Sequence, residues 1–234
     1  MNRESQMITL AFDVYGTLIN TQGVVTLLEK MVGDKADDFS RSWRNKQLEY
    51  SFRRGLMKQY APFSQCTIDA LDYTCNLFNE DLTSTERKKL IEAYDELPPF
   101  DDVIPCLKQL ATRPVRLFAF SNGQFAAVKK LLDHAEILPL LIDIISVDEV
   151  QSFKPDPAVY HYFLRQSGSK EDQSWLISSN PFDVIGASHA GIKSIWLKRE
   201  QNSLLDPWDI KPELTIDNLC ALKDIIDDLT SSQI

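Results

Sequence analysis

The sequence predicts an α/β fold, a doubly wound parallel sheet that carries an inserted helical subdomain. Two observations predict it. From Asn122 onward, short apolar runs alternate with amphipathic segments, which is typical of the βα units of a parallel sheet. The stretch 21–97 departs from this alternation, because it contains no clear strand and is rich in Glu, Lys, Arg, Leu and aromatic residues. We therefore expect a core of residues 1–20 and 98–234 and a helical subdomain of residues 21–97.

The elements of the expected core are these, in chain order. Each expected strand is an apolar run that ends in small or polar residues: 8–14, 115–121, 141–147, 175–179 and 194–197. The expected helices carry apolar residues at helical spacing: 123–135, 156–166, 182–190 and 217–229. The helical subdomain lies between the first two strands, and Pro98-Pro99 marks its end because proline cannot continue a helix.

Charge and composition exclude several classes of partner. The formal net charge of -9 argues against a nucleic-acid partner or an anionic membrane surface, since either needs a clustered positive field. No apolar run approaches the roughly 18 residues of a membrane span and no signal peptide is recognisable, so we expect a cytoplasmic protein. The four cysteines form no C-x-x-C pair, which indicates reduced packing residues rather than a zinc site.

Polar residues follow four of the five expected strands. Ligands of an open parallel sheet collect beyond the carboxyl ends of its strands, so these residues are the candidates for chemistry. Each of them singly could cap a helix or form a turn. Those local roles do not explain why all of them lie at one edge of one sheet, and we predict a polar site there. The candidates, in strand order, are Asp13 and Thr17, Ser121 and Asn122, Lys154, and finally Ser178, Asn180 and Asp183.

These segments resemble, in order, the four motifs of the haloacid dehalogenase superfamily. Asp13-Val14-Tyr15-Gly16-Thr17-Leu18 is similar to its first motif, Ser121-Asn122-Gly123 to its second, Lys154-Pro155 to its third, and Ser178-Ser179-Asn180-Pro181-Phe182-Asp183 to its fourth. Within the superfamily the chain resembles the L-2-haloacid dehalogenases, over essentially its whole length. The resemblance implies a Rossmann-like core, with 21–97 as the cap that the superfamily places after its first motif.

Tyr15 separates two chemistries. Most relatives are magnesium-dependent phosphatases, in which an Asp two residues after the nucleophile protonates the departing alkoxide. A halide leaves as a weakly basic anion and needs no such proton, so Tyr15 fits carbon–halogen cleavage, although a packing role would explain it equally well. Ser178 and Ser179 stand where a magnesium site would want a carboxylate. They resemble the dehalogenase version of this loop, which works without a metal, so we expect no metal ion and no cofactor.

The helical insert contains a further match. Residues 42–50 resemble the dehalogenase cap helix that carries the halide-binding arginine, which corresponds to Arg44. A basic helix face is otherwise commonly a solvated surface. The family's Gln after this arginine is Asn45 here.

The resemblance implies a role for each candidate residue. Asp13 is the nucleophile, Thr17 holds its carboxylate, and Lys154 offsets its charge. The water that completes the reaction is positioned by Asp183 together with Asn180 and Ser178. Tyr160 supports Lys154 and Asp183, although a tyrosine at this helical position could equally be core. Arg44, Asn122 and the ring of Phe182 contact the halide. Ser121 and the backbone near Val14 and Tyr15 bind the substrate carboxylate. The pocket walls are Tyr15, Leu48, Phe63 and Phe182.

The expected function is hydrolytic dehalogenation of short L-2-haloacids to D-2-hydroxyacids through an aspartyl ester. The expected partners are a small 2-haloacid and the halide ion, and the resemblance implies a homodimer. Two alternatives stay open at this point. One is a magnesium-dependent phosphatase of the same superfamily that acts on a small phosphomonoester. The other is a catalytically silent binding protein that keeps the fold.

Overall fold

The first strand of the chain, β1, lies in the middle of the sheet. The computed structural model describes residues 7–231. Within them six strands form one sheet in the order β3-β2-β1-β4-β5-β6, and all neighbouring strands are parallel. This arrangement confirms the predicted doubly wound α/β fold. The strands are β1 (Ile8–Asp13), β2 (Val115–Ser121), β3 (Asp143–Ser146), β4 (Ser174–Ser178), β5 (Lys193–Leu197) and β6 (Leu214–Ile216).

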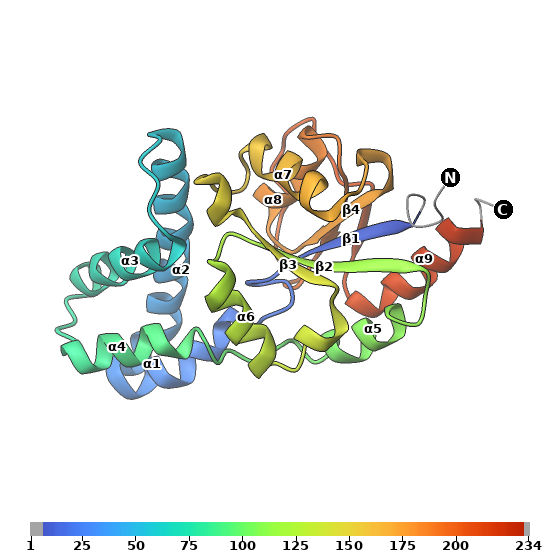
Figure 1. Cartoon of the computed structure of the whole chain (residues 1–234). Helices are drawn as coiled ribbons and strands as arrows, with labels where there is room; N and C mark the ends of the chain where they lie inside the picture. The colour runs from blue at the N-terminus through green and yellow to red at the C-terminus, as the bar shows by residue number, and fades with distance from the viewer. Residues whose placement is uncertain (1–6, 232–234) are drawn as a thin grey trace.

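Helices cover both faces of the sheet (Figure 1). Side chains alternate along β1, so Leu10 and Phe12 enter one apolar cluster while Ala11 enters the other. The first cluster includes residues of α5 (Val103–Leu110), α6 (Phe125–His134) and α9 (Leu222–Ser231). The second includes residues of α7 (Pro157–Ser167) and α8 (Pro181–His189). Burial on both faces explains why the strands read as apolar runs in the sequence.

The chain between β1 and α5 forms four α-helices that stand beside the sheet, at the left in Figure 1. They are α1 (Val25–Val32), α2 (Ala36–Leu56), α3 (Phe63–Phe78) and α4 (Ser84–Ala93). The buried ring of Trp43 on α2 donates from Nε1 to the carbonyl of Thr67 on α3 at 2.9 Å, which fixes the two longest helices together. Thr83 and Glu86 form a capping box that begins α4.

The two crossings between this helical segment and the sheet are paired with each other. The N–H of Asn20 donates to the carbonyl of Pro98 at 2.8 Å, and that of Phe100 donates to the carbonyl of Leu18 at 3.1 Å. The chain therefore enters and leaves the helical segment at one place, beside the sheet. We propose that the helical subdomain is bounded by these crossings, as residues 21–97, with 1–20 and 98–234 as the core.

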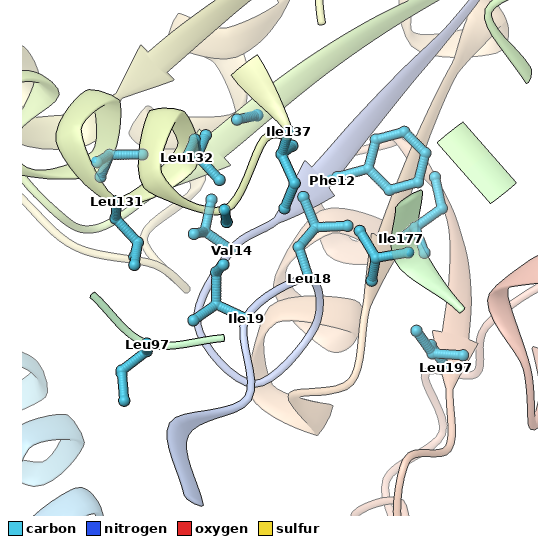
Figure 2. Packing of buried hydrophobic residues seen from close by; sticks show 14 of the residues in the cluster. Phe12, Val14, Leu18, Ile19, Leu97, Leu131, Leu132, Ile137, Ile177 and Leu197 are labelled. Carbon is cyan, nitrogen blue, oxygen red and sulfur yellow. The ribbon is translucent and has the colours of Figure 1, made fainter. Parts of the chain in front are cut away.

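The loop after β1 is anchored by apolar side chains that enter the first core cluster. Val14, Leu18 and Ile19 are fully buried, and Figure 2 shows them among Leu131, Leu132, Ile137, Ile177 and Leu97. The N–H groups of Leu18 and Ile19 both donate to the carbonyl of Val14, which closes the loop into a tight turn. The polar residues of this loop are thus held on the side away from the apolar cluster.

Three features of the core differ from the sequence prediction. β3 is shorter than 141–147, because single turns of 3-10 helix at Leu138–Leu140 and Val147–Val150 flank it. β6 was not predicted, since it has only three residues and two of them are exposed. α5 was not predicted either. It contains Pro105, which reads as a helix breaker but is tolerated in a first turn.

No helix between residues 7 and 231 is both long enough and apolar enough to span a membrane.

Candidate active site

The candidate residues of the motifs meet at the carboxyl edge of the sheet. Asp13 ends β1, the central strand, and is paired in register with Phe120, so Ser121 at the end of β2 and Asn122 just after it lie beside Asp13. Ser178 ends β4 on the other side of β1. Lys154 reaches the same point from the segment after β3. The topology therefore brings together four chain segments that are far apart in the sequence.

The two carboxylate oxygens of Asp13 have unequal surroundings. Oδ2 accepts three hydrogen bonds, from Asn180 Nδ2 at 2.7 Å, Thr17 Oγ1 at 2.9 Å and Ser178 Oγ at 3.2 Å. Oδ1 is contacted by Lys154 Nζ at 3.2 Å. Oδ2 is thus saturated with donors, while Oδ1 keeps a lone pair for reaction. Asp13 is 7% exposed, so the carboxylate is nearly stripped of bulk water.

Lys154 is a buried cation between two buried carboxylates. Its Nζ lies 3.2 Å from Asp13 Oδ1 and 2.8 Å from Asp183 Oδ2, and it also donates to the carbonyl of Phe120 at 2.8 Å. These three acceptors use all three ammonium protons. The ammonium lies 4.2 Å from the centre of the Phe120 ring as well. Lys154 is therefore fixed in position and offsets the negative charge of the site.

Asp183 is fully buried at the first turn of α8. Burial raises the pKa of this carboxyl to about 6, and the charge of Asp13 adds to the rise while Lys154 opposes it. Its Oδ1 accepts from Tyr160 Oη at 2.8 Å. A carboxylate whose pKa lies near 6 can take a proton from water close to neutral pH. Tyr160 is fully buried, so it is both a core residue and a hydrogen-bond donor to Asp183.

Gly186 makes room for the contact between Tyr160 and α8. A Cβ at this position would lie 2.5 Å from Tyr160 Oη and 2.6 Å from Pro155 Cβ. Any larger residue would push the phenol away from Asp183.

The loops of the first and fourth motifs are joined by Thr17 and Ser179. The backbone N–H of Ser179 donates to Thr17 Oγ1 at 2.9 Å, and its hydroxyl donates to the carbonyl of Gly16 at 2.6 Å. Arg199 also holds this turn, through hydrogen bonds of 2.7 and 3.2 Å to the carbonyl of Thr17. Its guanidinium pairs with both oxygens of Asp102 at 2.8 Å. The loop that carries the nucleophile is therefore fixed from two sides.

Arg44 reaches the site from α2. Its guanidinium donates to the carbonyl of Tyr15 at 3.4 Å and to Gln47 Oε1 at 3.3 Å, and Gln47 in turn donates to Tyr94 Oη at 2.9 Å. Burial lowers the pKa of Arg44, but a guanidinium stays charged near neutral pH. Among residues 7–231 no carboxylate forms an ion pair with Arg44, so its charge is available to an anion.

Asn122 and Ser121 present donors at the same edge. Asn122 Oδ1 accepts from the backbone N–H of Lys154 at 2.9 Å, which turns the amide nitrogen toward other acceptors. Ser121 Oγ accepts from the N–H of Gly123 at 3.1 Å, which leaves its hydroxyl proton to donate. Both side chains can therefore bind an anion.

The predicted wall residues lie in two groups. Tyr15 stacks on Phe63 at 6.4 Å between ring centres, and Leu48 packs against the cluster of Phe63 and Phe153. Leu48 also lines a cavity of about 570 Å³ together with Arg44, Asn180 and Arg199. Phe182 packs edge-on against Phe52 at 5.0 Å. Phe182 and Arg44 line different cavities, and the predicted halide role of Phe182 stays a prediction.

The donor set does not fit a magnesium ion. Mg²⁺ prefers six oxygen ligands in octahedral geometry. Here Lys154 lies within 3.2 Å of both carboxylates, and the fourth-motif oxygens come from Ser178 and Ser179 hydroxyls that are already bonded. Between residues 7 and 231 no three His, Cys, Asp or Glu side chains gather as metal ligands.

Several residues of the site were not predicted from the sequence. Gln47 could have been found from its position three residues after Arg44 on one helix face. Ser179 lies in the fourth motif, but its bonds to Thr17 and Gly16 were not predicted. Tyr94, Arg199 and the carbonyl of Phe120 reach the site through the fold and carry no local signal. The three histidines, which fall in no motif, are exposed. The four cysteines are free thiols.

Comparison with known proteins gives a consistent result. The family model of haloacid dehalogenase-like hydrolases matches residues 8–191. An (S)-2-haloacid dehalogenase of Pseudomonas putida is 34% identical over 91% of this chain and 93% of its own. Haloacetate dehalogenase H-2 of a Moraxella species is 35% identical over 93% and 96%. The structure of L-2-haloacid dehalogenase from Xanthobacter autotrophicus with chloropropionic acid covalently bound has a TM-score of 0.87 and 27% identity, over 94% and 98%.

Proposed function

The chain belongs to the haloacid dehalogenase-like hydrolases, and we propose that it hydrolyses the carbon–halogen bond of short L-2-haloacids to give D-2-hydroxyacids and halide. The observation that carries this proposal is the unequal binding of the two Asp13 oxygens. Oδ1 accepts a hydrogen bond from Lys154 alone and keeps a lone pair to attack, while Oδ2 is held by three donors. Relatives named (S)-2-haloacid dehalogenase, aligned over nine-tenths of the chain, support it.

The first step is displacement of the halide by Asp13. Oδ1 attacks the α-carbon from the face opposite the halogen, so a carbon–oxygen bond forms as the carbon–halogen bond breaks, and the centre inverts. Burial keeps the carboxylate poorly hydrated, and the three bonds to Oδ2 aim it. Orientation of this kind is worth roughly 7 to 11 kcal/mol. The related structure with chloropropionic acid covalently bound supports an ester intermediate.

The departing halide carries away the negative charge of the nucleophile. Arg44 and Asn122 are the donors that receive it, because the Arg44 charge is not paired with a carboxylate of the described chain and the Asn122 amide nitrogen is turned outward. The ring edge of Phe182 is a softer third contact. The substrate carboxylate is received by the Ser121 hydroxyl and by backbone N–H groups near Val14 and Tyr15.

The second step is hydrolysis of the ester by water. Asp183 takes a proton from the water as it attacks Cγ of Asp13, and the developing oxyanion forms on Oδ2, where Thr17, Ser178 and Asn180 already donate. Donors fixed in advance at such an oxygen are worth about 10²–10³ in rate each. Collapse of the intermediate breaks the bond between Cγ and the ester oxygen, and the departing alkoxide takes the proton from Asp183. The second proton of the water passes to solvent as Asp13 returns to its carboxylate form. Tyr160 and Lys154 hold Asp183 in place.

The alternatives are less well supported. A phosphatase needs an acid two residues after the nucleophile to protonate an alkoxide. Tyr15 stands there, and burial raises its pKa well above the ordinary value, so it is a poor acid. A silent binding protein gains nothing from a buried Asp–Lys–Asp set, which is costly to desolvate. The helical subdomain would act as the cap that excludes water. A homodimer is proposed from the family resemblance.

The decisive assay measures halide release from (S)-2-chloropropionate, beside phosphate release from p-nitrophenyl phosphate, each with EDTA and with magnesium. We expect halide release that EDTA does not lower. Magnesium-dependent phosphate release without halide release would overturn the proposal. Rapid-quench mass spectrometry should also detect an ester on the wild-type protein that is absent from Asp13→Asn.

A further inference from the structure

A second cavity adjoins the site and differs from the first in chemistry. It has a volume of about 490 Å³ and lies between the end of α2 and the segments 152–157 and 182, with Trp208 at its edge. Phe52, Gly55, Phe153, Pro155 and Phe182 line it. Cavities of this size accept small organic ligands.

The polar groups in its wall are already bonded. Ser51 donates to the carbonyl of Leu48 at 2.8 Å, and Ser152 donates to Asp156 at 2.6 Å. The ammonium of Lys154, which also belongs to the wall, points to Asp13 and Asp183. The cavity therefore offers an occupant apolar surface and has little hydrogen-bonding capacity to spare.

Two wall residues connect this cavity with the reaction centre. Lys154 contacts Asp13 Oδ1, the attacking oxygen, and Phe182 stands two residues after Asn180, which donates to Oδ2. The cavity of 570 Å³, whose wall includes Asn180 and Pro181, is also lined by Arg41, Arg44 and Arg199. An alkyl group attached to the α-carbon gains less beside charged side chains than against apolar walls.

From this we infer that the apolar cavity receives the alkyl chain of 2-haloalkanoic acids longer than propionate, so that the preferred substrates are acids of about four to six carbons. The inference rests on the proposed function, because it specifies the substrate of that reaction. Each methylene buried in an apolar site strengthens binding by about fourfold. The specificity constant should therefore rise about fourfold per added carbon, until the chain reaches the exposed rim at Leu56 and Trp208.

Gly55 allows the cavity to be filled without touching the catalytic groups. A Cβ at this position would have its nearest neighbours, Phe153 and Ser152, at 3.9 Å, which is ordinary contact. Gly55 lies in the last turn of α2, where leucine is a better helix former than glycine. The Gly55→Leu variant should therefore fold. Arg53→Leu, on the same helix and outside the cavity wall, is the matched control.

The experiment measures halide release from the (S)-2-chloro acids of three to six carbons. The wild type should show a rise in kcat/KM of roughly sixtyfold from propionate to hexanoate. Gly55→Leu should keep its propionate activity within about twofold and lose most of the rise, whereas Arg53→Leu should retain it.

Three results would overturn the inference. A flat or falling dependence in a wild type that releases halide from propionate contradicts it while leaving the proposed function intact. Absence of halide from every acid contradicts the proposed function itself. Gly55→Leu could also keep the chain-length dependence while analytical ultracentrifugation shows a different mass of the assembly in solution. In that case the cavity is an interface between two copies of the chain, and the inference is wrong.

Discussion

The hydrogen bond from Tyr160 to Asp183 gives the sharpest prediction. The Tyr160→Phe variant removes only the hydroxyl, and the ring keeps its packing against Phe120 at 5.8 Å between centres. A hydrogen bond to a charged group is worth about 1.5 to 3 kcal/mol. Because Tyr160 donates to the ionised carboxylate, its loss disfavours that form, and the pKa of Asp183 must rise. At 1.36 kcal/mol per unit, the rise is roughly 1 to 2 units.

The expected effect is a shifted pH profile with a preserved first step. Wild-type ester hydrolysis should gain rate as pH rises through about 6, where Asp183 ionises. In Tyr160→Phe the same rise should occur at about pH 7 to 8. At pH 7 the variant should therefore accumulate the Asp13 ester, measured by rapid-quench mass spectrometry, while the burst of halide release stays unchanged.

The matched control is Tyr162→Phe, two residues later on the same helix, which should leave the profile unchanged. If Tyr160→Phe shows the wild-type acid limb while it binds substrate and forms the ester normally, then Asp183 is not the base for water, or Tyr160 does not tune it.

Three further predictions concern packing and charge. Gly186→Ala places a Cβ 2.5 Å from Tyr160 Oη, so it should slow ester hydrolysis at least tenfold. Gly55→Ala, whose Cβ would have no atom closer than 3.9 Å, should not slow it. Equal rates for the two variants would contradict this reasoning. Lys154→Met leaves the Asp13 and Asp183 carboxylates buried without their cation, and urea unfolding should show a free energy of unfolding lower by about 3 to 5 kcal/mol. A decrease below about 1 kcal/mol would mean that the ion pairs are not needed for folding. Thr9 Oγ1 is buried without a hydrogen-bond partner among the described residues, so Thr9→Val should stabilise the protein by about 1 kcal/mol and raise Tm by about 2 to 4 °C in calorimetry; a lower Tm would show that the hydroxyl is bonded in solution.

The positions of the motif residues could be predicted because each stands at the end of a buried strand. Asp13, Asn122 and Ser178 follow apolar runs, and parallel strands place their ends at one edge. That rule needs only local sequence and the strand order. The contacts of Lys154 with Asp13 and Asp183 agree with it. The catalytic roles of these residues stay predictions until the variants are measured.

Contacts that join distant segments could not be predicted in the same way. Gln47 bonds Tyr94 across 47 positions, and Arg199 pairs with Asp102 across 97. Neither pair has a fixed spacing or a characteristic neighbour, because their meeting depends on how helices α1 to α4 and the chain after β5 pack. The short strand β6 was missed for a related reason, since it is defined by its pairing with β5 rather than by an apolar run.

The unequal hydrogen bonding of the two Asp13 oxygens makes this side chain a reagent that is consumed and renewed. Because water attacks Cγ, the hydroxyacid leaves with Oδ1, so every product hydroxyl is an oxygen that the protein held one turnover earlier. The oxygen of the water takes its place, while the three donors retain Oδ2. In ¹⁸O-water each enzyme molecule therefore releases one unlabelled product and then only labelled ones. If the carboxylate could rotate between turnovers, the second turnover would give a mixture of labelled and unlabelled hydroxyacid. The original Oδ2 atom would then also be lost to product.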